Sequence, residues 1–303
     1  MSCILCKSEK VILKETVKKE DLFSGYRKIS NVNLGPLVKQ DLKLMSCSNC
    51  SLMYYDPVIS GNEDFYNSLQ EKPWYYVDQK LEYKTASEYI KPQMRVLDIG
   101  CGRGAFSSYV ENKAATFIGL EKSANAQVMA ENNKIKIIVD DIENFANEYP
   151  SSVDVACAFQ VCEHVEDVGK FIQSMIKSVK INGKIIISLP SYDSFLGMSS
   201  NVYLNMPPHH LSLWRDSVFK SMEEIFNIEL ETIHHEKLEY VHKHWYFASI
   251  IQSLFLKPKL IDKSYRRRFF SKLSGLISRA ISGRIDDKYL GRGHTVTAVF
   301  KVL

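Results

Sequence analysis

From about residue 91 onward, short apolar runs alternate with segments whose apolar residues recur every three or four positions. The apolar runs predict strands at 95–99, 116–120, 136–139, 153–159 and 184–189. The segments between them predict helices at 105–112, 124–132 and 168–179. Strands that alternate with helices are typical of βαβ units and a parallel sheet. We expect a turn at 181–184 to stop the last helix before the fifth strand.

Other segments flank this repeating pattern. Residues 217–225 predict a short helix, and we interpret the β-rich segments 228–233 and 294–302 as an antiparallel pair that closes the sheet. Between them, residues 236–292 form an insertion with a mostly helical pattern. Residues 60–89 also have a helical pattern and contain an aromatic cluster, Phe65, Tyr66, Trp74, Tyr75, Tyr76, Tyr83 and Tyr89. These rings either pack the N-terminal residues onto the next domain or form part of a lid over a ligand.

A glycine-rich turn follows the first predicted strand of the repeating pattern. Segment 96–104 reads VLDIGCGRG, so an apolar run ends at Asp98 and is followed by Gly100, Gly102 and Gly104. Glycine permits positive φ and leaves no Cβ to block a ligand at the carboxyl end of a strand. Such a turn points backbone N–H groups outward at the start of a helix, where an anionic group binds well.

Two classes of enzyme use a turn of this kind. A nicotinamide-dependent oxidoreductase requires the spacing G-x-G-x-x-G, and position 105 is Ala here, which some such proteins accept. Asp98 discriminates better, because an anion so close to the turn repels a pyrophosphate and favours a ligand with positive charge. S-adenosylmethionine carries an ammonium and a sulfonium group and no phosphate. The pattern therefore favours S-adenosylmethionine over a dinucleotide.

Polar residues follow the next three predicted strands. The second strand ends at Glu121, where an acid can reach the ribose hydroxyls of an adenosine ligand. The third ends in Asp140-Asp141-Ile142, where an aspartate can accept a hydrogen bond from the adenine amino group while Ile142 packs on the ring. The fourth runs into the segment FQVCEHV at 159–165. Its polar residues face the same crevice, because the carboxyl ends of parallel strands meet at one edge.

The chain has seven cysteines, four of which form the C-x-x-C pairs Cys3/Cys6 and Cys47/Cys50. Four thiolates can bind one tetrahedral zinc ion and leave no coordination position open for catalysis, so we expect a structural site. The alternative is two reduced thiol pairs. The segment between the pairs is hydrophilic and poor in strand signals, and it needs a metal to hold it together.

Composition limits the remaining possibilities. With 303 residues and 45% hydrophobic residues, the chain can bury one large domain and a small appendage. We see no secretory signal and no apolar run of about 18 residues, so we expect a cytoplasmic protein without a transmembrane helix. The net charge of +4 is modest, but residues 257–288 carry ten Lys or Arg against three Asp or Glu.

The ordered segments VLDIGCGRG, FIGLE, VDDIENF, FQVCEHVED and NGKIIISLP resemble the motif series of class I S-adenosylmethionine-dependent methyltransferases. The resemblance covers about residues 95–233 and the last strand. The cysteine pairs before this region and the string PPHHLSLW after it resemble a bacterial branch that includes sugar methyltransferases and enzymes of surface-polysaccharide or natural-product gene sets. The chain is also similar to ubiquinone-type O-methyltransferases, which lack the cysteine pairs.

The resemblance implies an α/β fold with a Rossmann-like, doubly wound, seven-stranded sheet. The implied organisation is a zinc-binding module at 1–59, a helical linker or lid at 60–91, the methyltransferase domain at 92–235 and 292–303, and a helical basic insertion at 236–291. Two other readings stay open, a nicotinamide-dependent oxidoreductase and a binding protein whose methyltransferase fold is inactive. The intact motif series argues against the second of these.

The resemblance also implies roles for the cofactor-binding residues. Gly100, Gly102 and Gly104 line the methionine and ribose part of S-adenosylmethionine, and Asp98 anchors the loop or the ammonium group. Further roles fall to Glu121 at the ribose, Asp141 and Ile142 at adenine, and Gln160 near the methionyl end. Asp140 stands where glycine is usual, so either aspartate is a candidate for the adenine contact. The role of His164 also stays open between binding and fixing its loop.

Methyl transfer to a hydroxyl group or a sugar carbon requires that the acceptor lose a proton. Histidine, with a pKa near ~6.5, is suited to that step. The string Pro207-Pro208-His209-His210 follows the fifth strand, where the acceptor pocket is expected to open. We take His210 as the first candidate for the catalytic base and His209 as the second. The alternative is that both are hydrogen-bonded structural residues.

The basic insertion bears on the partners of the protein. Residues 265–270 read YRRRFF, which suits a solvated helix face above the acceptor pocket. It equally suits a phosphate-bearing acceptor or peripheral contact with anionic lipid through residues 257–288. We expect a small-molecule or glycan acceptor and no nucleic acid, because no basic groove interleaved with aromatic residues is present elsewhere.

Overall fold

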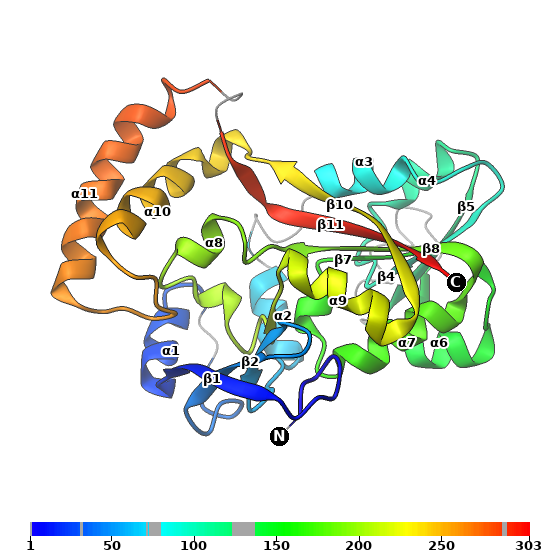
Figure 1. The fold of residues 1–303 in the computed structure, drawn as a ribbon, viewed down its shortest axis with the longest axis horizontal. Helices are drawn as coiled ribbons and strands as arrows, with labels where there is room; N and C mark the ends of the chain where they lie inside the picture. The colour runs from blue at the N-terminus through cyan, green and yellow to red at the C-terminus, as the bar shows by residue number, and fades with distance from the viewer. Residues whose placement is uncertain (1, 31–32, 71, 73–79, 123–136, 287–289) are drawn as a thin grey trace.

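A seven-stranded mixed sheet organises the molecule, as the computed structural model shows for residues 2–30, 33–70, 72, 80–122, 137–286 and 290–303 (Figure 1). The strand order is β10-β11-β8-β7-β4-β5-β6. The strands are β4 Arg95–Ile99, β5 Thr116–Glu121, β6 Ile137–Val139, β7 Val153–Phe159, β8 Val179–Pro190, β10 Ile228–Lys237 and β11 Arg292–Val302. Strands β4 to β8 are parallel, and β11 runs antiparallel to both β8 and β10. The α/β fold class and the closing antiparallel pair are therefore confirmed.

The turn expected at 181–184 is wrong, because β8 begins at Val179 and runs through these residues. Helix α7 (Val168–Ser178) leads directly into the strand. Asn182 has a φ of +64°, and a Cβ on Gly183 would lie 2.7 Å from the Asp154 carbonyl oxygen. The Asn-Gly pair therefore allows a close approach between β8 and β7, where the register shifts, and it does not end a helix.

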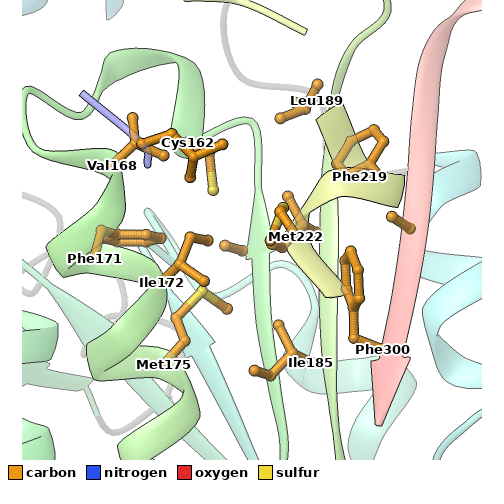
Figure 2. Close-up of a cluster of buried hydrophobic side chains, with 14 of the residues drawn as sticks. Cys162, Val168, Phe171, Ile172, Met175, Ile185, Leu189, Phe219, Met222 and Phe300 are labelled. Carbon is orange, nitrogen blue, oxygen red and sulfur yellow. The ribbon is translucent and has the colours of Figure 1, made fainter. Parts of the chain in front are cut away.

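Helices cover both faces of the sheet. Helices α6 (Ile142–Glu148), α7 and α9 (Asp216–Phe226) pack on one face, and α3 (Leu81–Ser87) and α4 (Ser107–Glu111) pack on the other. Successive strand residues alternate between the two cores, so Ile185 and Ile187 belong to the first core and Ile186 to the second. Figure 2 shows side chains of α7 and α9 meeting the strands in the first core.

Some predicted features lie outside the described residues. These are the helix at 124–132, the first residue of the strand at 136–139, and the aromatic residues Trp74, Tyr75 and Tyr76. The helical pattern of the insertion is confirmed by α10 (Lys243–Phe255) and α11 (Tyr265–Ser282). Two further short helices are α2 (Glu63–Gln70), which follows β3, and α8 (Phe195–Met198), which follows β8.

The N-terminal residues form a second sheet with the order β1-β2-β3-β9, so the expectation of a strand-poor segment is wrong. Its strands are β1 Val11–Val17, β2 Leu42–Cys47, β3 Met53–Asp56 and β9 Ser212–Leu213, with α1 (Lys19–Tyr26) between the first two. Leu42 and Leu44 are buried while Lys43 is exposed, which is the alternation of a half-buried strand. Strand β9 is distant in sequence from the other three strands. It begins two residues after His210 and pairs with β3.

The first cysteine pair is packed onto α7. The backbone N–H of Gly169 donates to the carbonyl oxygen of Ile4 at 2.9 Å. A Cβ on Gly169 would lie 2.5 Å from the Leu5 carbonyl oxygen, closer than a side chain can come to a rigid backbone. Glycine is therefore required where the cysteine pair meets the main domain.

We predict that Gly169→Ala destabilises the protein by about 1–3 kcal/mol, because the methyl group overpacks this contact. Gly275→Ala is the matched control, since it also lies in a helix and has nothing within 4 Å of its added Cβ. That change should stabilise the protein by about 0.4–1 kcal/mol. Urea unfolding of both variants measures the difference, and equal stabilities would contradict the packing argument.

Candidate active site

The glycine turn lies between β4 and α4 and adopts the backbone that its sequence predicts. Gly100, Gly102 and Gly104 have φ values of +68°, +52° and +75°. A Cβ on Gly100 would lie 2.7 Å from Cγ2 of Val161, so the turn also has no room for a side chain there. Side chains larger than hydrogen are disfavoured at all three positions.

A cavity of about 1270 Å³ opens at the carboxyl edge of β4, β5 and β7. It is larger than the pockets of roughly 300–1,000 Å³ that hold one small ligand, so it has room for two. The structure brings almost all of the predicted site residues to its lining, namely Asp98, Gly100, Gly102, Glu121, Asp141, Ile142, Gln160, His209 and His210. Gly104 is buried within the turn and does not belong to the lining.

Asp98 ends β4 beneath the glycine turn, and its side chain is buried. Burial raises the pKa of this carboxyl group well above its usual value, and the carboxylates of Glu121 and Glu82 raise it further, while Lys80 acts in the opposite direction. The charge of Asp98 is thus suppressed until a cation compensates for burial. A ligand that carries an ammonium group supplies that compensation.

Glu121 joins the end of β5 to the glycine turn. Its Oε2 accepts a hydrogen bond from the N–H of Gly102 at 3.0 Å, and its Oε1 accepts from the N–H of Lys122 at 2.8 Å. A carboxylate offers about four acceptor positions, so one such group can bind backbone N–H groups and ribose hydroxyls together.

The two aspartates after β6 are both used by the local fold. Asp141 caps α6 by accepting from the N–H of Asn144 at 2.9 Å. Asp140 accepts from the side-chain amide of Asn144 at 2.9 Å, and these two hydrogen bonds fix the start of the helix. Both carboxylates also border the cavity beside Ile142, so both remain candidates for a contact with adenine.

Glu82 is a buried residue of this region that sequence reasoning missed. It projects from α3, and its Oε2 accepts from the side-chain amide of Gln160 and from the hydroxyl of Ser188, both at 2.8 Å. Lys80, at the edge of the cavity, lies 3.5 Å from the other carboxylate oxygen. No sequence signal identifies Glu82, because it lies in a helical segment without a motif and meets Gln160 only through the tertiary fold.

His209 and His210 lie in the same cavity as the glycine turn, with their rings stacked at 4.5 Å between centroids. The ring of His164 is 4.6 Å from the first and 4.9 Å from the second. Burial lowers the pKa of His164 to about 4 and that of His209 to about 3, and it lowers the pKa of His210 well below its usual value. The three imidazoles are therefore neutral at neutral pH.

Backbone carbonyls orient two of these rings. Nδ1 of His164 donates to the carbonyl oxygen of His209 at 2.6 Å, and Nδ1 of His209 donates to that of Leu204 at 3.0 Å. A neutral ring that donates from Nδ1 keeps a lone pair on Nε2. That lone pair can accept a proton. The three rings also each place a nitrogen within 4.8 Å of the others, which is a spacing that can hold a metal ion.

Glu163 is the second residue that sequence reasoning missed, although it stands in the segment FQVCEHV. Its side chain is 1% exposed, and neither carboxylate oxygen has a hydrogen-bond partner in the described structure. Burial raises the pKa of this carboxyl group to about 8. One oxygen lies 3.9 Å from Nε2 of His164, so an acid and a base group meet at the acceptor end of the cavity.

The N-terminal sheet holds the segment that carries the two histidines. The hydroxyl of Tyr26 donates to the carbonyl oxygen of Met206 at 2.7 Å, and that of Tyr55 donates to Asn205 at 3.0 Å. Both tyrosines are fully buried. Strand β9, which pairs with β3, fixes the other end of the segment. Residues 1–59 therefore help to position the histidines, together with hydrogen bonds from the N–H of Gly61 to Pro208 and from the N–H of Leu211 to Glu163.

The four cysteines of the two C-x-x-C pairs come together in this N-terminal sheet. The sulfur atoms of Cys3 and Cys50 lie 3.5 Å apart, and those of Cys6 and Cys47 lie 3.6 Å apart. All four sulfur atoms lie within 4.8 Å of one another, an arrangement that can hold a metal ion. The Cys50 thiol is the main cause that lowers the pKa of Cys3, to about 5, which favours a thiolate at this position.

Comparisons with known proteins agree with this geometry. Residues 74–235 match the model of a family described as a methyltransferase domain, which is more than half of the chain. A solved S-adenosylmethionine-dependent methyltransferase of Archaeoglobus fulgidus has the same fold, with a TM-score of 0.52 and 18% identity over 78% of this chain and 99% of that one.

Curated relatives include two ubiquinone biosynthesis O-methyltransferases. The one of Proteus mirabilis is 30% identical over 38% of this chain and 51% of its own length. The one of Azorhizobium caulinodans is 33% identical over 31% of this chain and 40% of its own length. The chain thus spans about half or less of the length of these relatives.

The fold is the class I methyltransferase fold, as the motif series predicts. The chain belongs to the methyltransferase-domain family. The nicotinamide-dependent alternative is therefore set aside.

The buried carboxyl group of Glu163 generates a prediction about pH. Its pKa is higher in the folded than in the unfolded protein, so folding favours the protonated form, and stability is lost as the pH rises from about 4.5 to about 8. Glu163→Gln keeps the shape and removes the ionisation. We expect the variant to gain about 1–3 kcal/mol relative to the parent between pH 5.5 and pH 8.5.

Urea unfolding of both proteins at the two pH values measures this gain. The three cavity histidines stay neutral in the folded protein above pH 5.5, because burial lowers their pKa values well below that pH, so they contribute little to the difference. A difference in stability between the two proteins that does not change with pH would show that Glu163 ionises normally in the folded state.

Proposed function

We propose that the protein transfers the methyl group of S-adenosylmethionine to a hydroxyl group of a small polar acceptor, with a sugar or glycan as the class that fits best. The observation that carries this proposal is the cluster of buried, neutral histidines in the same cavity as the glycine turn. The acceptor end is lined by His164, His210, Glu163 and Asn205, which suit a ligand with several hydroxyl groups. The names of the relatives support oxygen as the methylated atom.

The proposal assigns the cofactor end as follows. The ammonium group of S-adenosylmethionine lies by Asp98, whose charge it restores. The ribose hydroxyls bind Glu121, and the methionyl part passes Gly100 and Gly102 toward Gln160. Adenine lies between Ile142 and the aspartates, of which we assign the contact to Asp141. Gly104 supports the turn from behind.

Catalysis would come mainly from alignment. Holding the acceptor oxygen in line with the methyl group and the sulfur can contribute about 7–11 kcal/mol. As the oxygen–carbon bond forms and the carbon–sulfur bond breaks, the hydroxyl proton passes to an imidazole nitrogen of His210, and neutral S-adenosylhomocysteine leaves. Burial makes this imidazole a weak base before the reaction, and above about pH 8 the ionised carboxylate of Glu163, which lines the same pocket, stabilises the imidazolium that forms.

We predict that His210→Asn lowers single-turnover methyl transfer by about 10²–10⁴-fold, because it removes the proton acceptor. Affinity for S-adenosylmethionine, measured by calorimetry, should not change. His235→Asn is the control, since that histidine pairs with Asp216 and is not part of the cavity lining.

The assay uses nucleotide-linked sugars beside a polyprenylated phenol, so that the acceptor class is tested together with the residue. Normal transfer by the His210 variant would remove it from the mechanism. Transfer only to the phenol would replace the sugar proposal.

We also propose that Cys3, Cys6, Cys47 and Cys50 bind one structural zinc ion. Four thiolates about 2.3 Å from a tetrahedral zinc ion lie about 3.8 Å from one another. The pairs at 3.5 and 3.6 Å are close to that spacing and far from the bond length of about 2.05 Å in a disulfide. Backbone N–H groups of Leu5 and Asn49 also point at the sulfurs of Cys3 and Cys47, which stabilises their negative charge.

We predict about one zinc ion per chain by elemental analysis, and its loss in Cys50→Ser. Because residues 1–59 hold the histidine segment, zinc loss should lower methyl transfer more than it lowers affinity for S-adenosylmethionine. Cys157→Ala is the control and should keep its zinc, since Cys157 is buried in the sheet away from the four sulfurs. A chain that purifies without bound metal and keeps full activity would contradict the assignment.

A further inference from the structure

Helices α10 and α11 form an antiparallel hairpin between β10 and β11, and Figure 1 shows it projecting beyond the edge of the main sheet. Its inner face is polar. Arg267 is 2% exposed and donates to Asp262, to Gln252 and to the carbonyl oxygen of Lys257 at 3.0–3.1 Å. Gln252 in turn donates to Ser274 at 3.0 Å. Hydrogen bonds therefore hold the two helices together, beside the stacked rings of Phe255 and Phe270, whose centroids lie 4.8 Å apart.

The outer face of the hairpin is apolar. On α11, Tyr265, Phe269, Leu273, Leu276 and Ile277 recur at intervals of three and four residues, so they share one side of the helix. All five are exposed, Tyr265 by 84% and Leu276 by 68%. Leu254 and Phe255 of α10 are exposed as well. An amphipathic helix on the surface of a protein in water normally turns its apolar side toward the core. In this hairpin the apolar side of α11 instead faces the solvent.

Basic side chains border the apolar side of α11. Arg268, Lys272 and Arg279 recur at the same helical spacing and form a neighbouring stripe, and all three are exposed. Helix α11 contains no acidic residue, and Asp262, near the end of the hairpin loop, is already paired with Arg267. The exposed surface of this helix therefore combines apolar contact area with net positive charge.

We propose that this outer face docks the protein on an anionic membrane surface. Apolar side chains would enter the boundary between headgroups and acyl chains, and the basic stripe would lie against lipid phosphates. Among the described residues, no helix is both long enough and apolar enough to cross a bilayer, so the contact is peripheral. A second copy of the chain fits less well, because two such faces would bring like charges together.

Docking in this way would also orient the cavity. Trp245 of α10 belongs to the cavity lining, so the hairpin reaches from the active site to the proposed lipid contact. An acceptor presented at the membrane surface would then lie close to the cavity mouth. The docking proposal itself rests on the hairpin and does not depend on which acceptor is methylated.

The test is co-sedimentation of the full chain with vesicles of phosphatidylcholine alone and of phosphatidylcholine with phosphatidylglycerol. We expect binding to the anionic vesicles that weakens with salt. Phe269→Ser combined with Leu276→Ser should lower partitioning at least about tenfold. Arg268→Gln combined with Lys272→Gln should lower it about thirtyfold on anionic vesicles.

The matched control is Ile12→Ser combined with Leu13→Ser, since these exposed apolar residues lie on β1 and are not part of the hairpin. This variant should bind as the parent does, and all variants should keep their affinity for S-adenosylmethionine. Failure of the parent to bind anionic vesicles at low salt would overturn the proposal. So would a dimer in size-exclusion chromatography that only the Phe269/Leu276 variant dissociates, which would assign the face to a second copy.

Discussion

Main-chain pairing between β3 and β9 is the interaction on which the acceptor end of the cavity depends. Strand β9 has two residues and begins two residues after the histidine pair, so it could not hold its place without a partner strand. The partner comes from the N-terminal sheet, and two buried tyrosine hydroxyls, that of Tyr26 in α1 and that of Tyr55 in β3, bind the backbone just before the histidines. A structural metal at the cysteines would therefore act on catalysis through this sheet.

The cofactor half of the site could be predicted from the sequence because its determinants are local. Three glycines within five residues need positive φ, and the acids to which we assign cofactor binding stand at the ends of strands whose order the pattern reveals. The acceptor half could not be predicted to the same extent. Glu82 is recognised by its hydrogen bond to Gln160, which is distant in sequence, and Glu163 by a buried carboxyl group without a hydrogen-bond partner in the described residues. Both are properties of the folded chain.

The errors in the fold have a related cause. The string Ile181-Asn182-Gly183 has the composition of a turn, but it lies inside β8 because the neighbouring strand β7 requires a close backbone approach. Likewise, β1 and β2 have weak strand signals on their own, and they form because each pairs with the other and β2 continues to β3. Local propensity describes such segments poorly when their partners are distant in the chain.

The hairpin of α10 and α11 is inserted in the sequence between β10 and β11, which are antiparallel neighbours in the main sheet. Helix α10 packs on α8 and lines the cavity through Trp245, whereas the apolar face of α11 is exposed. Related enzymes could therefore change the outer surface of α11 and keep their chemistry. The same catalytic domain could then act at different places in a cell, and the surface of the inserted hairpin would decide which.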